Sequence, residues 1–487
     1  MQDESLHDAT IPVDDAEDIM VEYYMVDSGT ERGKRKLVDS TGFSYTVKKQ
    51  KNDHVLWRCT KRSKTINCPA TIIQDGDDYR PGQKQHIHAG DPGSHIALRI
   101  KAEVKQQAKD ATFEERSSSI VEKAITAHGD ISAPAGSRPN PGYLIRTANR
   151  VRQMDRPKDP SDLHDELDLD FLERHAPGFL RRDLLVGDRR HLIFFTERQL
   201  DLLAKAKTWY MDGTFRCVNH PWKQMFSIHG FVKSGHRIKQ VPLVFAIMSG
   251  KSQEDYYQVL RFIDHQLPES IALEGFVADF EAALWKALKD RFPGTPIQGC
   301  VFHWTQAVFR KVQEHGLQTA YNKKDSVYKF VRQLLALPFL PPEHIEETFL
   351  RLDGRAPEVL APVMDYVYRT WIRSSIFKIH HWSVFMTSIR TNNDVEGWHN
   401  RLNTSVVTRG SVPFYHLILV LYREATNITV QMKMVSEGKI QRFQRKRTLQ
   451  VEGRVFKLWN SYCERSITAS ELLKGCASIY GPPVLNM

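Results

Sequence analysis

The sequence predicts an α/β protein built on a mixed sheet, with a small β-rich module ahead of that sheet. Within residues 205–324, three apolar runs are followed by helical stretches that alternate with shorter apolar runs. This order is typical of a helix-covered sheet with both parallel and antiparallel strands. Residues 35–95 instead contain short β-like runs broken by polar turns, with cysteine and histidine at metal-ligand spacing.

Each element of the main body is predicted from a local pattern. Short apolar runs bounded by turn residues predict strands, and longer stretches with a 3.6-residue apolar period predict helices. Ser252-Gln-Glu-Asp255 resembles a capping box and predicts the start of the first helix. The expected strands are 208–217, 225–233, 240–248, 275–279 and 296–300, and the expected helices are 252–266, 281–291 and one that begins near 301.

Changes of composition divide the chain further. Residues 1–31 contain ten acids and no lysine or arginine, a composition typical of disorder. Residues 132–142 are rich in proline and glycine and predict a linker. The expected divisions are an acidic disordered leader (1–34), the β-rich module (35–95), a helical and linker region (96–204), the first part of the core (205–324), a helical insertion (325–385), the last part of the core (386–440) and a basic C-terminal tail (441–487).

The charge balance favours a polyanionic partner. The formal net charge is +10, and removing the ten acids of residues 1–31 leaves +20 on the rest of the chain. Basic surfaces bind nucleic acids because neutralised phosphates release condensed counterions; a generally basic soluble surface is the alternative. No membrane span or secretory signal is expected, and six irregularly spaced cysteines favour a reducing compartment.

Three carboxylates are the candidates for catalysis. Asp212 and Asp279 each follow a strand-like run, and Glu396 lies in a stretch with a helical pattern. Ligands gather at strand ends in such sheets, and three acids with substrate phosphates suffice for two divalent cations. Asp212, at the end of a central strand, is the expected bridging ligand. Each acid alone could instead cap a turn or a helix, and Asp394 is a rival for the place of Glu396.

Four motifs accompany these acids in a fixed order: Asp212-Gly-Thr-Phe215, Val277-Ala-Asp-Phe-Glu-Ala-Ala-Leu284, Gly299-Cys-Val-Phe-His-Trp304 and Thr391-Asn-Asn-Asp-Val-Glu-Gly-Trp-His-Asn-Arg-Leu402. The series resembles the Mutator-like element (MULE) transposases over about residues 205–405. The resemblance implies a ribonuclease H-like fold with a helical insertion before the glutamate. It also implies that Asp212, Asp279 and Glu396 are a catalytic DDE triad that binds Mg²⁺ or Mn²⁺. Family transposases generally act as multimers, so a homo-oligomer on double-stranded DNA is expected.

Polar residues around Glu396 share one face of the expected helix. They are Asn393, Glu396, His399 and Asn400. Such a stripe could hold a DNA phosphate, orient Glu396 or face solvent. Asn393 and His399 are the candidates for DNA contact, whereas Trp398 points elsewhere and is expected to pack.

Cys300 and His303 have metal-ligand spacing, but two ligands do not make a zinc site. Similar transposases carry a Cys-x-x-His pair after the second aspartate. The resemblance gives this pair a structural or a DNA-contacting role, so Cys300 and His303 are further candidates for DNA contact.

The β-rich module contains four candidate zinc ligands, Cys59, Cys68, His86 and His88. Two sulfurs and two imidazoles suit tetrahedral Zn²⁺, which would supply folding energy that so small a core lacks. Gly42-Phe-Ser-Tyr45, Trp57-Arg-Cys59 and Cys68-Pro-Ala70 resemble the FLYWCH-type zinc finger over residues 36–89. The resemblance implies that these cysteines and the His-x-His bind zinc. The sequence departs from the family in having Leu37 or Val38 at its first aromatic position, and His95 is an alternative ligand.

Basic residues surround the four ligands and suit contact with DNA phosphates. The candidates are Lys49, Arg58, Lys61 and Arg62. The aromatic residues Tyr45 and Trp57 are expected to form a small core. Such a finger could recognise transposon ends, or it could bind protein. Basic clusters at 33–36 and 439–447 could direct nuclear import or contact phosphate.

Together these features predict a nuclear DNA transposase of the MULE type with a FLYWCH-type finger for DNA binding. The expected reaction is metal-dependent strand cleavage at transposon ends, followed by strand transfer. One alternative is a domesticated transposase that acts as a DNA-binding transcriptional regulator without transposition. Another is a zinc-finger module for protein interaction.

Overall fold

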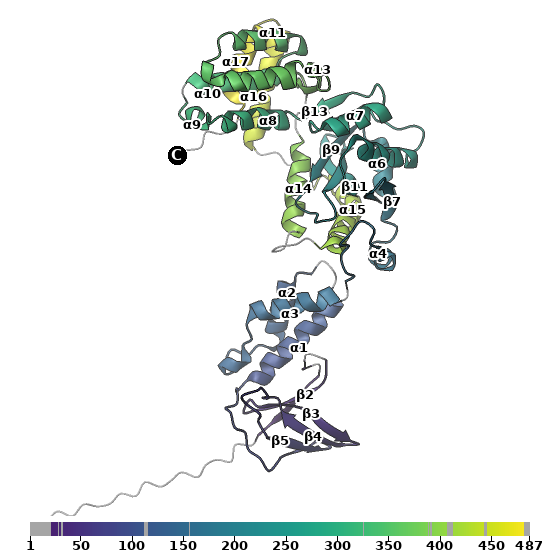
Figure 1. Cartoon of the computed structure of the whole chain (residues 1–487), viewed down its shortest axis with the longest axis vertical. Coiled ribbons are helices and arrows are strands. Elements are labelled where there is room, and N and C mark those ends of the chain that lie inside the picture. The colour runs from purple at the N-terminus through teal and green to yellow at the C-terminus, as the bar shows by residue number, and fades with distance from the viewer. Residues whose placement is uncertain are drawn as a thin grey trace, which may run out of the picture. The chain divides into compact units, whose positions relative to one another are not determined.

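A computed structural model describes residues 21–27, 29–30, 33–111, 115–154, 156–324, 326–387, 389, 392–406, 413–442 and 446–481. The chain divides into two compact units, residues 1–156 and 157–487, which are described separately (Figure 1). Of the expected leader, residues 1–20 lie outside the described residues. Residues 23–26, also assigned to the leader, form a strand.

The first unit begins with a six-stranded antiparallel sheet whose strands follow chain order. Residues alternate between its two faces, so Val55, Trp57 and Cys59 of one strand all enter the core. Tyr45 and Ile72 join the same core. The strands are β1 (Tyr23–Val26), β2 (Lys36–Asp39), β3 (Ser44–Lys51), β4 (His54–Cys59), β5 (Thr71–Asp75) and β6 (Asp78–Pro81).

Three helices complete the first unit and have a core of their own. Ile100, Val104, Ile120 and Leu144 are buried between them. The region expected to be helical with a linker therefore begins as a packed helical bundle. The helices are α1 (Ser94–Asp110), α2 (Ser117–His128), the short turn η1 (Ala135–Ser137) and α3 (Pro141–Met154).

The second unit is centred on a seven-stranded mixed sheet with the order β13-β12-β9-β10-β11-β8-β7. β9, β12 and β13 are parallel, and the remaining pairs are antiparallel. The mixed α/β class is confirmed, and β9 lies inside the sheet as expected for the strand that carries Asp212. The strands are β7 (Leu180–Val186), β8 (Arg189–Phe194), β9 (Thr208–Thr214), β10 (Gln224–Ser234), β11 (Arg237–Met248), β12 (Gly275–Ala278) and β13 (Ile297–Gly299).

Helices cover both faces of this sheet. Met211 of β9 and Leu260 of α6 belong to the larger core on one face. On the other face, Tyr210 and Val277 pack against Val395 of α14. The helices are α4 (Leu169–His175), α5 (Glu197–Lys205), α6 (Gln253–Gln266), α7 (Ala282–Arg291), α14 (Asn393–Val406) and α15 (Phe414–Ser436).

A helical lobe lies between β13 and α14 in the sequence, where a helical insertion was expected (Figure 1). Two C-terminal helices pack into its core through Val455, Trp459 and Leu472, so most of the expected basic tail is folded. The elements are α8 (Val301–Glu314), α9 (Gln318–Asn322), α10 (Ser326–Leu335), η2 (Leu337–Phe339), α11 (Pro342–Asp353), η3 (Glu358–Leu360), α12 (Ala361–Val367), the π-helix η4 (Tyr368–Ile372), α13 (Ile379–Trp382), α16 (Lys446–Cys463) and α17 (Ala469–Ile479).

Candidate functional sites

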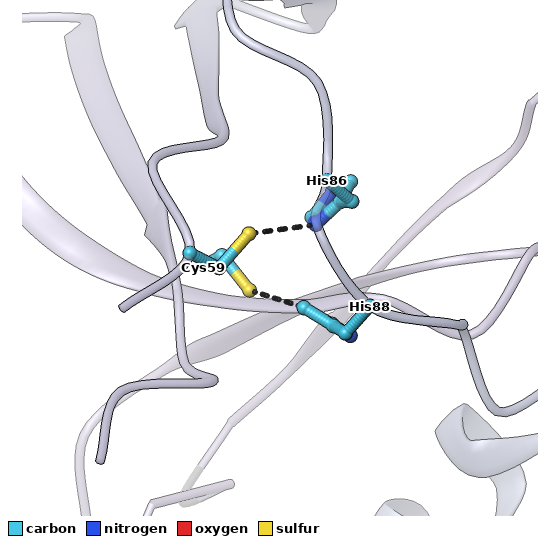
Figure 2. A group of neighbouring side chains, drawn as sticks. Cys59, His86 and His88 are labelled. Carbon is cyan, nitrogen blue, oxygen red and sulfur yellow. Dashed lines mark hydrogen bonds between the residues drawn. The ribbon is translucent and has the colours of Figure 1, made fainter. Parts of the chain in front are cut away.

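The four predicted zinc ligands lie together in the first unit. Cys59 ends β4, Cys68 lies in the following loop, and His86 and His88 follow β6. Cys59 Sγ is 3.2 Å from His88 Nε2, and Cys68 Sγ is 3.4 Å from His86 Nδ1. Tetrahedral zinc would separate a sulfur and a nitrogen ligand by about 3.6 Å. The cluster is therefore close to the size that zinc needs, and Figure 2 shows His86 and His88 each beside a cysteine sulfur, with Cys59 next to His88.

The outward nitrogens of both histidines are also occupied, which fits a zinc site. His86 Nε2 lies 2.8 Å from the Tyr45 hydroxyl, which donates to Asp39. His88 Nδ1 lies 2.8 Å from the carbonyl oxygen of Ala89. These contacts leave one nitrogen of each ring for the metal.

His95 does not join this cluster. Its ring stacks on Tyr24, with centroids 4.2 Å apart. Leu37 and Val38 are the candidates for the position where the FLYWCH family has its first aromatic residue. Both are fully buried, so this position still packs in the core.

All four basic residues proposed to contact DNA are exposed on the finger: Lys49, Arg58, Lys61 and Arg62. Arg62 also donates to the carbonyl of Cys68 at 3.1 Å, so it supports the metal loop as well. Tyr45 and Trp57 are 1% and 2% exposed, which confirms their expected place in a small core.

The second unit brings the three predicted acids together. β9 and β12 are parallel neighbours with Met211 opposite Ala278, so the residues that follow, Asp212 and Asp279, meet at one edge. The two carboxyl groups are close enough that each affects the pKa of the other. Glu396 approaches from the first turn of α14. Three residues far apart in sequence thus form one acidic centre.

His303 lies between two of these acids. Its Nδ1 is 2.7 Å from Asp279 Oδ1, and its Nε2 is 3.3 Å from Glu396 Oε1. Burial lowers the pKa of His303, but the nearby Asp279 carboxylate and Cys300 sulfur outweigh burial and raise it to about 11. The imidazolium therefore supplies positive charge to the centre.

Burial disfavours ionisation of two acids in this centre. Burial, followed by the charge of Asp212, raises the pKa of Asp279 to about 7 despite His303. Burial likewise raises the pKa of Glu396. Asp279 Oδ1 and Glu396 Oε1 are buried atoms that share one cationic neighbour, the His303 ring. Buried carboxylate oxygens in this state fit a divalent cation.

A buried chain of hydrogen bonds holds the carboxyl group of Asp212. His399 Nδ1 lies 3.0 Å from Asp212 Oδ2, and His399 Nε2 lies 3.1 Å from Ser227 Oγ. His229 Nε2 lies 2.9 Å from the same hydroxyl. Burial favours the neutral acid, but the bond from His399 keeps the pKa of Asp212 below its usual value. The network can fix the orientation of this carboxylate.

Ser227 and His229 were not among the predicted site residues. Residues directly opposite in an antiparallel pair share a face. Ser227 pairs with Asp212 and His229 pairs with Tyr210, so all four point toward α14. The alternation of β10 was visible in the sequence, but its register against β9 was not.

The structure separates Glu396 from its rival. Asp394 is bonded to the Arg442 guanidinium at 2.8 Å and lies away from the other acids. Trp398 packs as expected, stacking on Phe245 and donating to Glu424 at 2.8 Å. Asn393 is exposed and remains available to a ligand.

Two residues predicted to contact DNA are buried, so the prediction was wrong for them. His399 is 5% exposed and bonded to Asp212, and Cys300 is fully buried. Cys300 Sγ accepts the backbone N–H of Asn392 at 3.1 Å, and the Asn392 side chain donates to the Met211 carbonyl. Cys300 therefore ties the start of α14 to the sheet. His303, which is partly exposed, stays accessible beside the acids.

A pocket of about 420 Å³ adjoins the acidic centre. Asp279 and His303 line it together with Lys251 and Arg310, whose positive charges suit phosphate. Phe215 also lines it and is 54% exposed, beside the Lys251 ammonium. Asp279 thus faces a space that offers both cationic and aromatic contacts.

Comparison with known families gives two matches. Residues 208–307 match the MULE transposase domain, and residues 28–88 match the FLYWCH zinc finger domain. The chain carries a MULE transposase domain. The first match contains Asp212, Asp279, Cys300 and His303, and the second contains all four zinc ligands. No curated protein matches the chain. Among the described helices, none is both long and apolar enough to cross a membrane.

Proposed function

We propose that this transposase-related protein is an active DNA transposase of the MULE type. The observation that carries the proposal is the convergence of Asp212, Asp279 and Glu396 beside a pocket that Lys251 and Arg310 help to line, with two of the acids inside the MULE domain. The proposed reaction hydrolyses a DNA strand at a transposon end. The freed 3′-hydroxyl then attacks target DNA, without a covalent protein–DNA intermediate.

The proposed metal ligands are the three carboxylates. Mg²⁺ or Mn²⁺, when bound, would activate the attacking oxygen and stabilise the leaving oxygen. His399 orients Asp212, and Lys251 and Arg310 offer cationic contacts for the scissile phosphate. His303 is placed to move aside from Glu396 or to remain as a second contact for phosphate.

The ribonuclease H-like fold is part of the same proposal. Three antiparallel strands, β9, β10 and β11, precede two parallel strands on the other side of β9. The helical lobe comes between β13 and the glutamate helix α14. This arrangement supports the domain divisions drawn from the sequence, with the core extended to include β7 and β8.

DNA recognition is proposed for the finger. The exposed Lys49, Arg58 and Lys61 are available to phosphates, since none of their positions is buried. We place the protein in the nucleus because a DNA substrate and two basic clusters favour it, and we propose action as a homo-oligomer.

The test is excision of a reporter flanked by the cognate inverted repeats. Wild type is compared with Asp212→Ala, and Asp394→Asn is the matched control because Asp394 is a carboxylate paired with Arg442. We expect excision with wild type and with the control, and a loss of at least about 10³-fold with Asp212→Ala. Equal excision by wild type and Asp212→Ala would refute the proposal.

A DNA-binding regulator without transposition is the second candidate. One observation favours it: His303 lies within ion-pair distance of both Asp279 and Glu396 and so offsets their charge in place of a cation. This candidate predicts specific DNA binding that depends on the finger, with no Mn²⁺ binding at the acids and no excision.

A further inference from the structure

Cys300 and His303 have a third potential metal ligand in the folded protein. Donor atoms of Cys300, His303 and Glu396 all lie within 4.8 Å of one another. Within the described ranges, the only other such group is the finger cluster. The missing ligand of the Cys-x-x-His pair is therefore one of the three candidate catalytic acids.

The spacing of these donors fits zinc more closely than a hydrogen bond. His303 Nε2 and Glu396 Oε1 are 3.3 Å apart, which is within ion-pair distance but longer than most hydrogen bonds. N–H···O bonds usually measure about 2.9–3.0 Å. Two zinc ligands at about 2.0–2.1 Å and tetrahedral angles would be about 3.3–3.4 Å apart.

The surroundings resemble the outer shell of a zinc site. The Asn392 N–H points at Cys300 Sγ from 3.1 Å, which stabilises a thiolate. Asp279 Oδ1 lies 2.7 Å from the other nitrogen of His303, the position of the carboxylate in carboxylate–histidine–zinc arrangements. A buried thiolate and an imidazole select zinc over magnesium, which prefers oxygen ligands.

We propose that Cys300, His303 and Glu396 form a second zinc site, which withdraws Glu396 from the magnesium centre and inhibits DNA cleavage. The inhibitory part rests on the proposed function, whereas zinc binding does not. Three protein ligands leave one position for water, so this site binds zinc less tightly and more reversibly than the finger does.

The test counts zinc bound to the full-length protein by titration against a chromophoric chelator. Wild type is expected to bind two equivalents, and Cys300→Ser one. Cys463→Ser is the matched control, because Cys463 is an exposed thiol outside both clusters, and it is expected to bind two. Glu396→Gln is a second variant, which leaves the buried thiol intact and is expected to bind one zinc equivalent. Asp394→Asn is its control and is expected to bind two.

Several outcomes would overturn the inference. One equivalent in wild type, or two equivalents in both Cys300→Ser and Glu396→Gln, removes the second site. The inhibitory role is tested by measuring Mn²⁺ binding with electron paramagnetic resonance. The second zinc equivalent should lower Mn²⁺ binding to wild type, and undiminished Mn²⁺ binding refutes the inhibitory role. If wild type binds two zinc ions but still does not cleave DNA in Mg²⁺ after the second zinc ion has been removed, the proposed function is refuted and the zinc site stands.

Discussion

The finger cluster and the acidic centre both gather potential metal ligands, but they differ in how well their atoms are satisfied. In the finger, His86 and His88 each have an occupied outer nitrogen and an inner nitrogen that faces its own cysteine sulfur. In the acidic centre, Asp279 and Glu396 share one His303 ring, and both have raised pKa values. The finger therefore has the donor set of a structural zinc site. The acidic centre keeps buried acids that resist ionisation, as expected where ions and phosphates exchange.

Removing one zinc ligand of the finger should have the largest effect on stability of the changes compared at the two sites. Cys59→Ser is expected to lose one zinc equivalent and to unfold the sheet of the first unit, because structural zinc contributes apparent binding energies of about 10–16 kcal/mol. Hydrogen exchange should lose protection in β3 to β5 and keep it in β9 to β11. Cys463→Ser is the control, and full protection of the finger in Cys59→Ser would contradict its zinc dependence.

Removing a ligand at the acidic centre should have the opposite effect on stability. Asp279→Asn is expected to raise the unfolding free energy of the metal-free protein by about 1–2 kcal/mol, because it removes a carboxylate whose burial costs more than its contact with His303 returns. The variant should also lose Mn²⁺ binding. Thermal unfolding in chelator checks stability, with Asp394→Asn as the control.

The increase in unfolding free energy caused by Asp279→Asn should depend on pH. The pKa of Asp279 is raised to about 7 in the folded state, so this state binds more protons than the unfolded one above the ordinary pKa of the acid. Its carboxylate therefore costs stability increasingly as the pH rises toward 7. The difference between variant and wild type should widen from pH 5 to pH 8, and a constant difference would show that Asp279 is not responsible.

Two matched substitutions, each of a residue that holds a histidine of one site in place, compare the two sites directly. Tyr45→Phe removes the hydroxyl that meets His86, and Ser227→Ala removes the hydroxyl that meets His399. Loss of such an outer partner typically weakens metal binding about 10-fold. We expect Tyr45→Phe to weaken zinc binding alone and Ser227→Ala to weaken Mn²⁺ binding alone, as measured by metal titration. A change at both sites for either variant would mean that the two sites are coupled.

The smallest effect is expected at the exposed basic face of the finger. Arg58→Ala should reduce DNA affinity only a few-fold and lower the slope of log affinity against log salt by about 1, as loss of one phosphate contact does. Lys109→Ala, at an exposed lysine of α1, should leave the slope unchanged. Fluorescence anisotropy at several salt concentrations measures both. An unchanged slope for Arg58→Ala removes Arg58 from the interface.

The sheet was predictable where apolar runs were continuous. The expected strand 240–248 and helix 252–266 lie within about three residues of β11 and α6, and the Ser252 capping box is present. β8 was missed because it carries buried Arg190 and His191, which break the apolar pattern. Asp183 forms an ion pair with Arg190 and Asp255 forms a hydrogen bond with His191, and only tertiary contacts identify these partners.

The acidic centre was predicted in its members but not in its contacts. Strand ends marked Asp212 and Asp279, and the resemblance chose Glu396 over Asp394. No local pattern shows that His399 binds Asp212, 187 residues away, or that His303 reaches Glu396. The C-terminal helices were likewise taken for a tail, because the positive charges near their start masked the buried Val455 and Trp459.

The hydrogen bond from Asn392 to Cys300 also has a consequence for how the protein can change in length. Its partners are 92 positions apart, so the chain that leaves for the helical insertion comes back beside its own starting point. The entropic cost of closing such a loop rises by only about 0.6 kcal/mol for each doubling of length. The insertion can therefore be lengthened or shortened by design at little entropic cost, provided that its packing against β13, α16 and α17 is kept.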